Sequence, residues 1–109
     1  MTTPDVWVIV ELHDSTKNRT AHRILAGWYG GYLHGDSWRL SSGIEKIVEQ
    51  DRHWEIHNHS GSIYLCHKET ERFSSYTQAI FEDYARENVY KELSIKKVNL
   101  TEIVNQYQS

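Results

Sequence analysis

The sequence predicts an α+β fold in which a mainly antiparallel, curved β-sheet of about five strands packs against one helix, with a short second helix at the C-terminus. Two observations carry this prediction. Alternating and β-branched segments fill roughly the first two thirds of the chain, and a helical apolar stripe appears only after them. Strands first and a helix afterwards is typical of α+β domains. The 109 residues fit a single domain, residues 1–109, and we expect residues 1–4 and 107–109 to fray.

The first strand is the plainest element of the sequence. Residues 6–13 form a β-branched run that is apolar at every position through Val10, which indicates a central strand covered on both faces. A polar turn separates it from a second strand over 23–29, and an extended pattern resumes at 38–40. Residues 44–50 could be helix or strand by periodicity, but their short length favours a strand with an irregularity.

Residues 53–68 are predicted to form a hairpin that turns at Ser60-Gly61. Because side chains alternate along a strand, this turn sorts them onto two faces. The apolar face, which we expect to pack against the helix, holds Trp54, Ile56, Ile63 and Leu65. The polar face holds His53, Glu55, His57, His59, Ser62, Tyr64 and Cys66.

The helix is predicted over about residues 75–88, where Ser75 to Gln78 has the spacing of a capping box. Its apolar stripe consists of Tyr76, Ala79, Ile80 and Tyr84, with Phe81 as a further candidate. Residues 93–100 alternate loosely and indicate an edge strand. Thr101 can cap a last short helix over 102–107.

Composition narrows the classes of function. The net charge is −3, from 12 basic and 15 acidic residues that are interspersed, so the basic face of a nucleic-acid binder is missing and nucleic acid is disfavoured as a partner. The single cysteine, Cys66, excludes an internal disulfide. The first residues lack the basic and long apolar stretches of a signal peptide or membrane span. We therefore expect a soluble, cytoplasmic protein that does not enter a membrane.

The sequence carries no catalytic signature. Cys66 has histidines nearby in the hairpin, but no segment supplies an oxyanion hole or an orienting acid. The glycines of residues 27–35 lack the Lys-Ser/Thr ending of a phosphate-binding loop. We predict a protein that is not an enzyme and uses no cofactor.

The segment 27–35 holds four glycines in nine residues and reads as a strand that ends in a wide loop. Trp28, Tyr29, Tyr32 and Trp38 supply rigid, amphipathic contact area there, so we predict recognition of a protein partner through this loop. If the backbone stays extended, Trp28 and Tyr32 share one side, with Tyr29 opposite. Small proteins of this kind are often accessory, inhibitory or encoded by mobile elements, and self-association stays open.

Three alternatives remain at this level. The rings of the glycine segment could fill the core, with the glycines permitting sheet curvature. His57, His59 and Cys66 could hold a zinc ion on the polar hairpin face. Trp28 and Tyr32 could line an apolar cleft for a small ligand.

Overall fold

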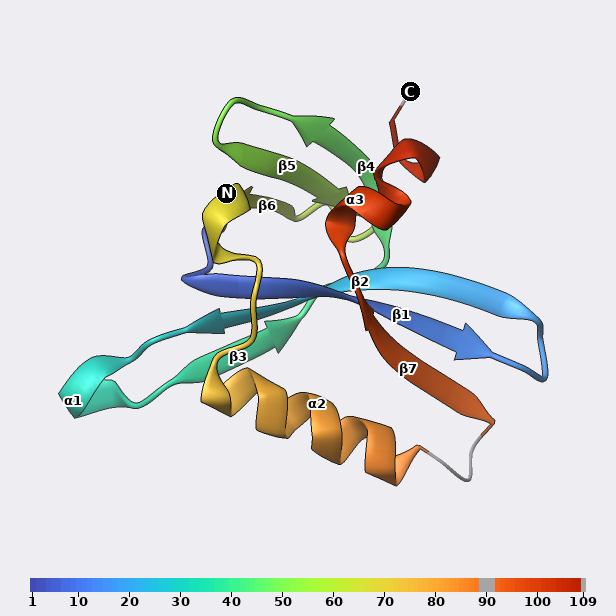
Figure 1. The fold of residues 1–109 in the computed structure, drawn as a ribbon, viewed down its shortest axis with the longest axis horizontal. Helices are drawn as coiled ribbons and strands as arrows, with labels where there is room; N and C mark the ends of the chain where they lie inside the picture. The colour runs from blue at the N-terminus through green and yellow to red at the C-terminus, as the bar shows by residue number, and fades with distance from the viewer. Residues whose placement is uncertain (89–91, 109) are drawn as a thin grey trace.

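The computed structural model describes residues 1–88 and 92–108, and it is built in three layers (Figure 1). A three-stranded sheet lies on one face of a four-stranded sheet, and the longest helix, α2, covers the other face. The elements are β1 (Val6–Asp14), β2 (Arg19–Trp28), α1 (Gly31–His34), β3 (Ser37–Leu40), β4 (Ile44–Glu49), β5 (His53–Asn58), β6 (Ile63–His67), the 3₁₀ turn η1 (Lys68–Thr70), α2 (Ser75–Glu87), β7 (Leu93–Val98), α3 (Leu100–Ile103) and the 3₁₀ turn η2 (Val104–Gln106).

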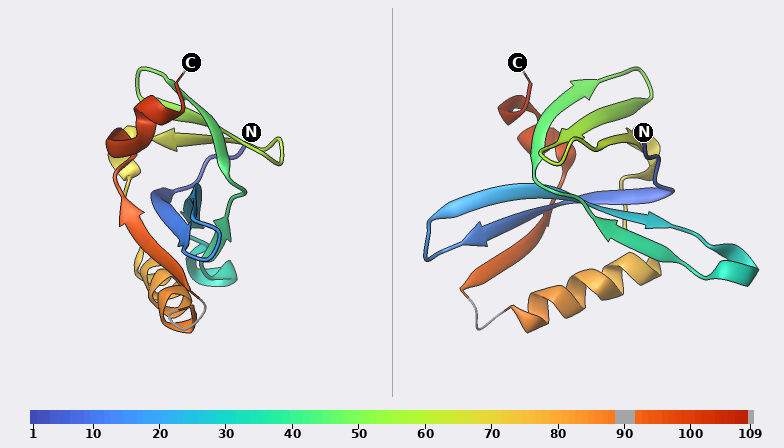
Figure 2. Two further views of the ribbon diagram at one scale, coloured as in Figure 1. Left: turned by 90° about the vertical axis from the view of Figure 1, so that its right-hand side faces the viewer. Right: turned by 180° about the vertical axis from the view of Figure 1, so that it is seen from behind.

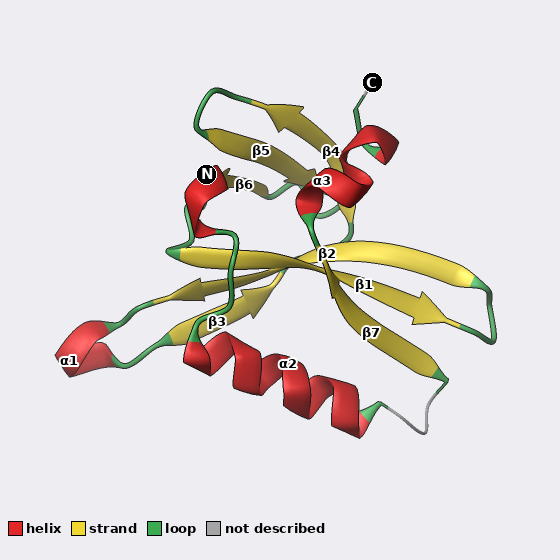
Figure 3. Cartoon of the chain, viewed as in Figure 1, coloured by secondary structure: helices red, strands yellow, loops and turns green. Residues whose placement is uncertain are grey.

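The predicted α+β class is confirmed, with every named strand pairing antiparallel (Figure 3). The central sheet has the order β3-β2-β1-β7, and the smaller sheet has the order β4-β5-β6. The described residues form seven strands in two sheets, where the sequence indicated about five strands in one sheet. β4 carries the expected irregularity as a register shift between Ile44 and Lys46. No helix among the described residues is long and apolar enough to cross a membrane.

The apolar run of β1 is explained by its central place between two layers. Trp7 and Ile9 join the core cluster beneath the three-stranded sheet, whereas Val8 and Val10 join the cluster beneath α2. Because alternate side chains of a strand point to opposite faces, both sets are buried at once.

The predicted sorting of the hairpin side chains is half wrong. Trp54 and Ile56 of β5 are buried as expected, but their cross-strand partners are Cys66 and Tyr64, which are also buried. The even-numbered residues of β6 therefore face the core. Ile63 and Leu65, expected inside, are only half-buried on the outer face.

The length of the hairpin loop causes this difference. Asn58 pairs with Ser62, since the Asn58 N–H donates to the Ser62 carbonyl at 3.0 Å. Three residues then connect the strands, and the Gly61 N–H closes a turn onto the Asn58 carbonyl at 2.9 Å. Gly61 takes the left-handed φ of 91° that three-residue hairpin loops require. An odd-length loop shifts the pairing by one residue and turns the opposite face of β6 inward.

The sequence predicted that the hairpin packs against the helix, and this prediction is wrong. The three-stranded sheet and α2 lie on opposite faces of the central sheet (Figure 2), so the two apolar surfaces never meet. On α2, Thr77, Ile80 and Phe81 pack against the sheet, whereas Tyr76 and Ala79 of the predicted stripe are exposed.

The start of α2 is tied closely to β2. The capping residue is Ser74, one position before the predicted Ser75, and its hydroxyl and that of Thr77 form a reciprocal capping box. Thr77 itself is buried against the sheet, where Gly27 leaves room for it. A Cβ atom at Gly27 would stand 2.7 Å from the Thr77 methyl carbon, so this glycine permits the close approach of helix and strand.

Both ends of the described chain contact the body. The Thr2 N–H donates to Ile63 and the Thr2 carbonyl accepts from Leu65, so this residue extends the three-stranded sheet at β6. The C-terminal helix begins at Leu100 with Asn99 as its N-cap residue, earlier than the predicted cap at Thr101. β7 is the edge strand expected from the sequence.

Candidate functional site: the β2–β3 arm

β2 and β3 form an arm that extends beyond the rest of the molecule, with α1 at its tip (Figures 1 and 2). The wide loop predicted from the glycines is a short helical turn. Gly31 and Gly35 flank it with left-handed φ values of 67° and 66°. Gly30 and Gly35 approach so closely that a Cβ atom at Gly30 would lie 1.3 Å from the Gly35 carbonyl oxygen. The glycines thus close the tip tightly.

At the base of the arm, Trp28 is a structural residue. It is half-buried against the core between the two sheets, and its Nε1–H donates to the Thr3 carbonyl at 3.0 Å. The Arg39 guanidinium lies 6.0 Å from its ring centroid. The neighbouring Tyr29 is 52% exposed, and its backbone N–H donates to Asp5 at 2.8 Å.

The tip of the arm is apolar and open to solvent. Tyr32 is 102% exposed and Leu33 is 83% exposed, relative to reference values. Trp38 is 43% exposed and lies on the face of the arm nearest α2. Of the four predicted binding residues, three are exposed and Trp28 is not. The prediction that Trp28 and Tyr32 share a side required an extended backbone, and the extended backbone ends at Trp28.

Leu33 was not singled out by the sequence reasoning. A leucine carries no recognition signal on its own, and only its position between Gly31 and Gly35 suggests that it cannot reach a core. The same geometry does not support the small-ligand alternative, because Tyr32 lies at the tip of the arm and Trp28 packs at its base. Neither ring lines any of the five best-formed hollows among the described residues.

The residues of the zinc alternative do not converge. His57 faces outward and lies 2.8 Å from a Glu55 oxygen, whereas Cys66 is fully buried on the opposite face of the sheet. His59 is exposed and lies 3.9 Å from Glu45. Within residues 1–88 and 92–108, no group of three or more acidic, histidine or cysteine side chains is placed to hold a metal ion. Burial raises the pKa of the Cys66 thiol, which keeps it protonated and unreactive.

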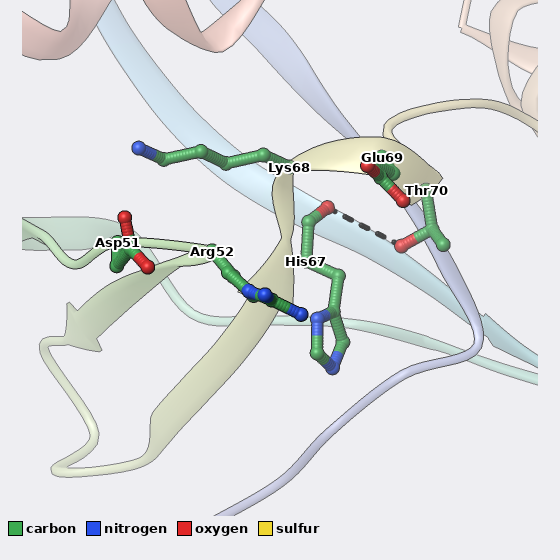
Figure 4. A pocket seen from close by; sticks show the side chains of 6 residues that line it. All are labelled: Asp51, Arg52, His67, Lys68, Glu69 and Thr70. Carbon is green, nitrogen blue, oxygen red and sulfur yellow. Dashed lines mark hydrogen bonds between the residues drawn. The ribbon is translucent and has the colours of Figure 1, made fainter.

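A charged hollow lies beside the end of β6 (Figure 4), lined by Asp51, Arg52, His67, Lys68, Glu69 and Thr70. Its wall mixes both signs of charge, and Lys68 is already paired with Glu49 at 2.6 Å. Thr70 donates to the His67 carbonyl at 3.3 Å. The carboxylates of Asp51 and Glu69 balance the charges of Arg52 and Lys68, so the hollow presents no excess of one charge to a ligand.

A buried polar network joins the C-terminus to the central sheet. The His22 ring is 3% exposed, with Nε2 lying 3.0 Å from Glu11 and Nδ1 lying 2.6 Å from the Tyr107 hydroxyl. Lys96 approaches the second Glu11 oxygen at 3.3 Å. The hydrogen bond from His22 lowers the pKa of Glu11, and burial raises that of Tyr107. In the neutral form of the His22 ring, Nε2 carries the proton and Nδ1 accepts from the Tyr107 hydroxyl, because the ionised Glu11 can only accept.

Comparisons with protein-family models, curated proteins and solved structures found no match for this chain.

Proposed function

We propose that this protein acts by binding another protein, and not by catalysis, and that the tip of the β2–β3 arm is the surface that recognises the partner. The observation that carries the proposal is the pair Tyr32 and Leu33, which stand side by side in α1 and are almost completely exposed. Leaving a large apolar side chain in water forgoes burial worth about 2 kcal/mol, and here two neighbours do so. Grouped apolar exposure of this kind typically marks an interaction site.

The construction of the arm supports this proposal. Anchors that are held in place before binding lose little conformational entropy when they bind. Trp28 fixes the base of the arm through its hydrogen bond to Thr3, and Asp5 holds the backbone of Tyr29. The tip is closed by the tight approach of Gly30 and Gly35. Tyr29, Tyr32 and Trp38 then provide the ring types that are enriched where binding energy is concentrated.

Photo-crosslinking in cells that make this protein tests the proposal. A photoreactive phenylalanine analogue replaces Tyr32 at the tip, or Thr16 in the exposed turn at the far end of β1. We expect a discrete adduct with another protein from position 32 and none from position 16. Identical adducts from both positions, or none from position 32, would contradict recognition by the tip.

A further inference from the structure

We propose that the outer edge of β3 binds an extended peptide segment in which apolar and acidic residues alternate, adding it to the central sheet as a fifth strand. This inference rests on the proposed protein-binding function and deepens it by naming the kind of partner segment. It depends on three features of the arm: an open backbone edge, an apolar hollow on one face of that edge and an unpaired arginine on the other.

The backbone groups of Trp38 and Leu40 point away from the sheet. Ser41, the residue after β3, donates its N–H to the Ile24 carbonyl at 2.9 Å, so its backbone faces β2. Backbone groups alternate in direction along an antiparallel strand, which turns Arg39 toward β2 and turns Trp38 and Leu40 outward. β3 ends the strand order, and no backbone hydrogen bond from residues 1–88 or 92–108 reaches these outer groups. An edge of this kind is a template for a further strand.

The side chains of the same two residues supply the apolar contact. Trp38 and Leu40 point toward α2, and together with Phe81 and Tyr84 they line a shallow hollow between the sheet edge and the helix. Trp38 is 43% exposed, so part of its apolar ring beside this hollow is open to solvent. Alternate side chains of an added strand would lie over this hollow, and those positions call for apolar residues.

Arg39 sets the chemistry of the other face. It lies between Trp38 and Leu40 in sequence, and therefore on the opposite side of β3, where its guanidinium rests near the Trp28 ring. Within the described part of the chain Arg39 forms no ion pair. The remaining alternate positions of an added strand face this charge, and a carboxylate there would complement it.

Two synthetic heptapeptides test the inference. In one, glutamate alternates with valine and phenylalanine; in its twin, lysine replaces every glutamate. Binding to the whole protein is measured by titration calorimetry, and the contact is located by amide chemical shifts. We expect the acidic peptide to bind at least about tenfold more tightly than its twin, with the largest shifts at Trp38 and Leu40. Absence of binding by the acidic peptide, or shifts centred elsewhere, would overturn the inference.

Charge reversal at Arg39 provides the matched variant. Arg39 is exposed, so Arg39→Glu should fold normally, and we expect it to favour the lysine peptide over the acidic one. Arg39→Gln should bind both peptides about equally. A preference for the acidic peptide that survives Arg39→Glu would also overturn the inference.

The variant Tyr32→Ser with Leu33→Ser separates this inference from the proposed function. We expect it to bind the acidic peptide as the wild type does, because the β3 edge is intact. If the peptides do not bind while crosslinking from position 32 succeeds, the proposal that the tip recognises a partner is supported and the β3 site is refuted. If the peptides bind while that crosslinking fails, the edge is the recognition surface and the tip is not.

Discussion

Gly27 is the residue that sets how closely α2 can approach the central sheet. A methyl group there would stand 2.7 Å from the Thr77 Cγ2 atom and 3.2 Å from Val6, so we expect Gly27→Ala to lower the free energy of unfolding by about 1–3 kcal/mol. Thr77→Ser removes the clashing methyl and keeps the capping hydroxyl. Denaturant unfolding should show that the double variant regains much of the loss, and failure to regain any would refute the steric explanation.

His22 depends on Tyr107 for its second hydrogen bond. Tyr107→Phe keeps the ring but leaves the buried His22 Nδ1 without its hydrogen-bond partner, which we expect to cost about 1–3 kcal/mol of unfolding free energy. Asn105→Ala, an exposed change in the same C-terminal segment, serves as the control. Equal stability of Tyr107→Phe and the wild type in urea would show that this contact contributes little.

The contact between His22 and Tyr107 also predicts that the stability of the fold depends on pH in the alkaline range. Burial, with a smaller effect of Glu11, raises the pKa of Tyr107 in the folded protein. The neutral hydroxyl therefore stabilises the fold below about pH 10, and that stability is lost as the pH rises through the higher folded pKa. Melting curves should show the advantage of the wild type over Tyr107→Phe shrinking above about pH 10. A constant difference would mean that Tyr107 does not ionise in this range.

At the scale of elements, the start of α3 relies on one carboxylate. Glu71 accepts the Leu100 N–H at 2.7 Å, and burial raises the pKa of Glu71. Because this pKa is raised, the contribution of Glu71 to the free energy of unfolding is present below about pH 4. That contribution is lost as the pH rises through the folded pKa. Glu71→Gln keeps an acceptor and removes the buried charge, so we expect a higher melting temperature than the wild type at pH 7 and equal values at acid pH. A lower melting temperature at pH 7 would contradict this.

The hairpin gives a direct comparison of its two faces. Ile56 is fully buried, and we expect Ile56→Ala to lower the free energy of unfolding by about 2–5 kcal/mol. Leu65 is half-buried on the outer face, so Leu65→Ala should cost less than half as much. Chemical denaturation of the two variants checks this, and an equally large loss for Leu65→Ala would restore the sorting that a two-residue loop implies.

Individual elements were more predictable from the sequence than the contacts between them. Periodicity and β-branching located β1 and α2 to within a residue or two, and the short length of its segment identified β4 as a strand, because local patterns report local structure. The orientation of β6 depended on the length of one loop, which a pattern of alternation does not specify. The contact between His22 and Tyr107 could not be predicted from the sequence either, because the two residues lie 85 positions apart in the chain.

At the scale of the whole molecule, β1 signalled its central place but not what covers it. An apolar strand shows that both faces are buried, and it does not say that one cover is a second sheet and the other a helix. The order of the strands in the chain also does not predict where one sheet ends, because β3 and β4 are consecutive and belong to different sheets. In the arm, the glycines and aromatic rings identified the segment as a candidate for recognition. Which of these rings are exposed depends on the turn that begins at Gly31, and the sequence did not predict this turn.

The central claim is that the tip of the arm serves recognition and not folding. Tyr32 and Leu33 have almost no buried surface, so replacing both with serine should leave the free energy of unfolding within about 0.5 kcal/mol of the wild type. His34→Ala, in the same turn and also exposed, is the matched control.

The most direct measurement is the affinity of the crosslinked partner, once purified, for the wild type and for the folded Tyr32→Ser, Leu33→Ser variant. We expect the double variant to bind at least about a hundredfold more weakly, since two anchors of a recognition surface are lost, and His34→Ala to bind nearly as well as the wild type. Equal affinity of the double variant and the wild type would contradict the claim.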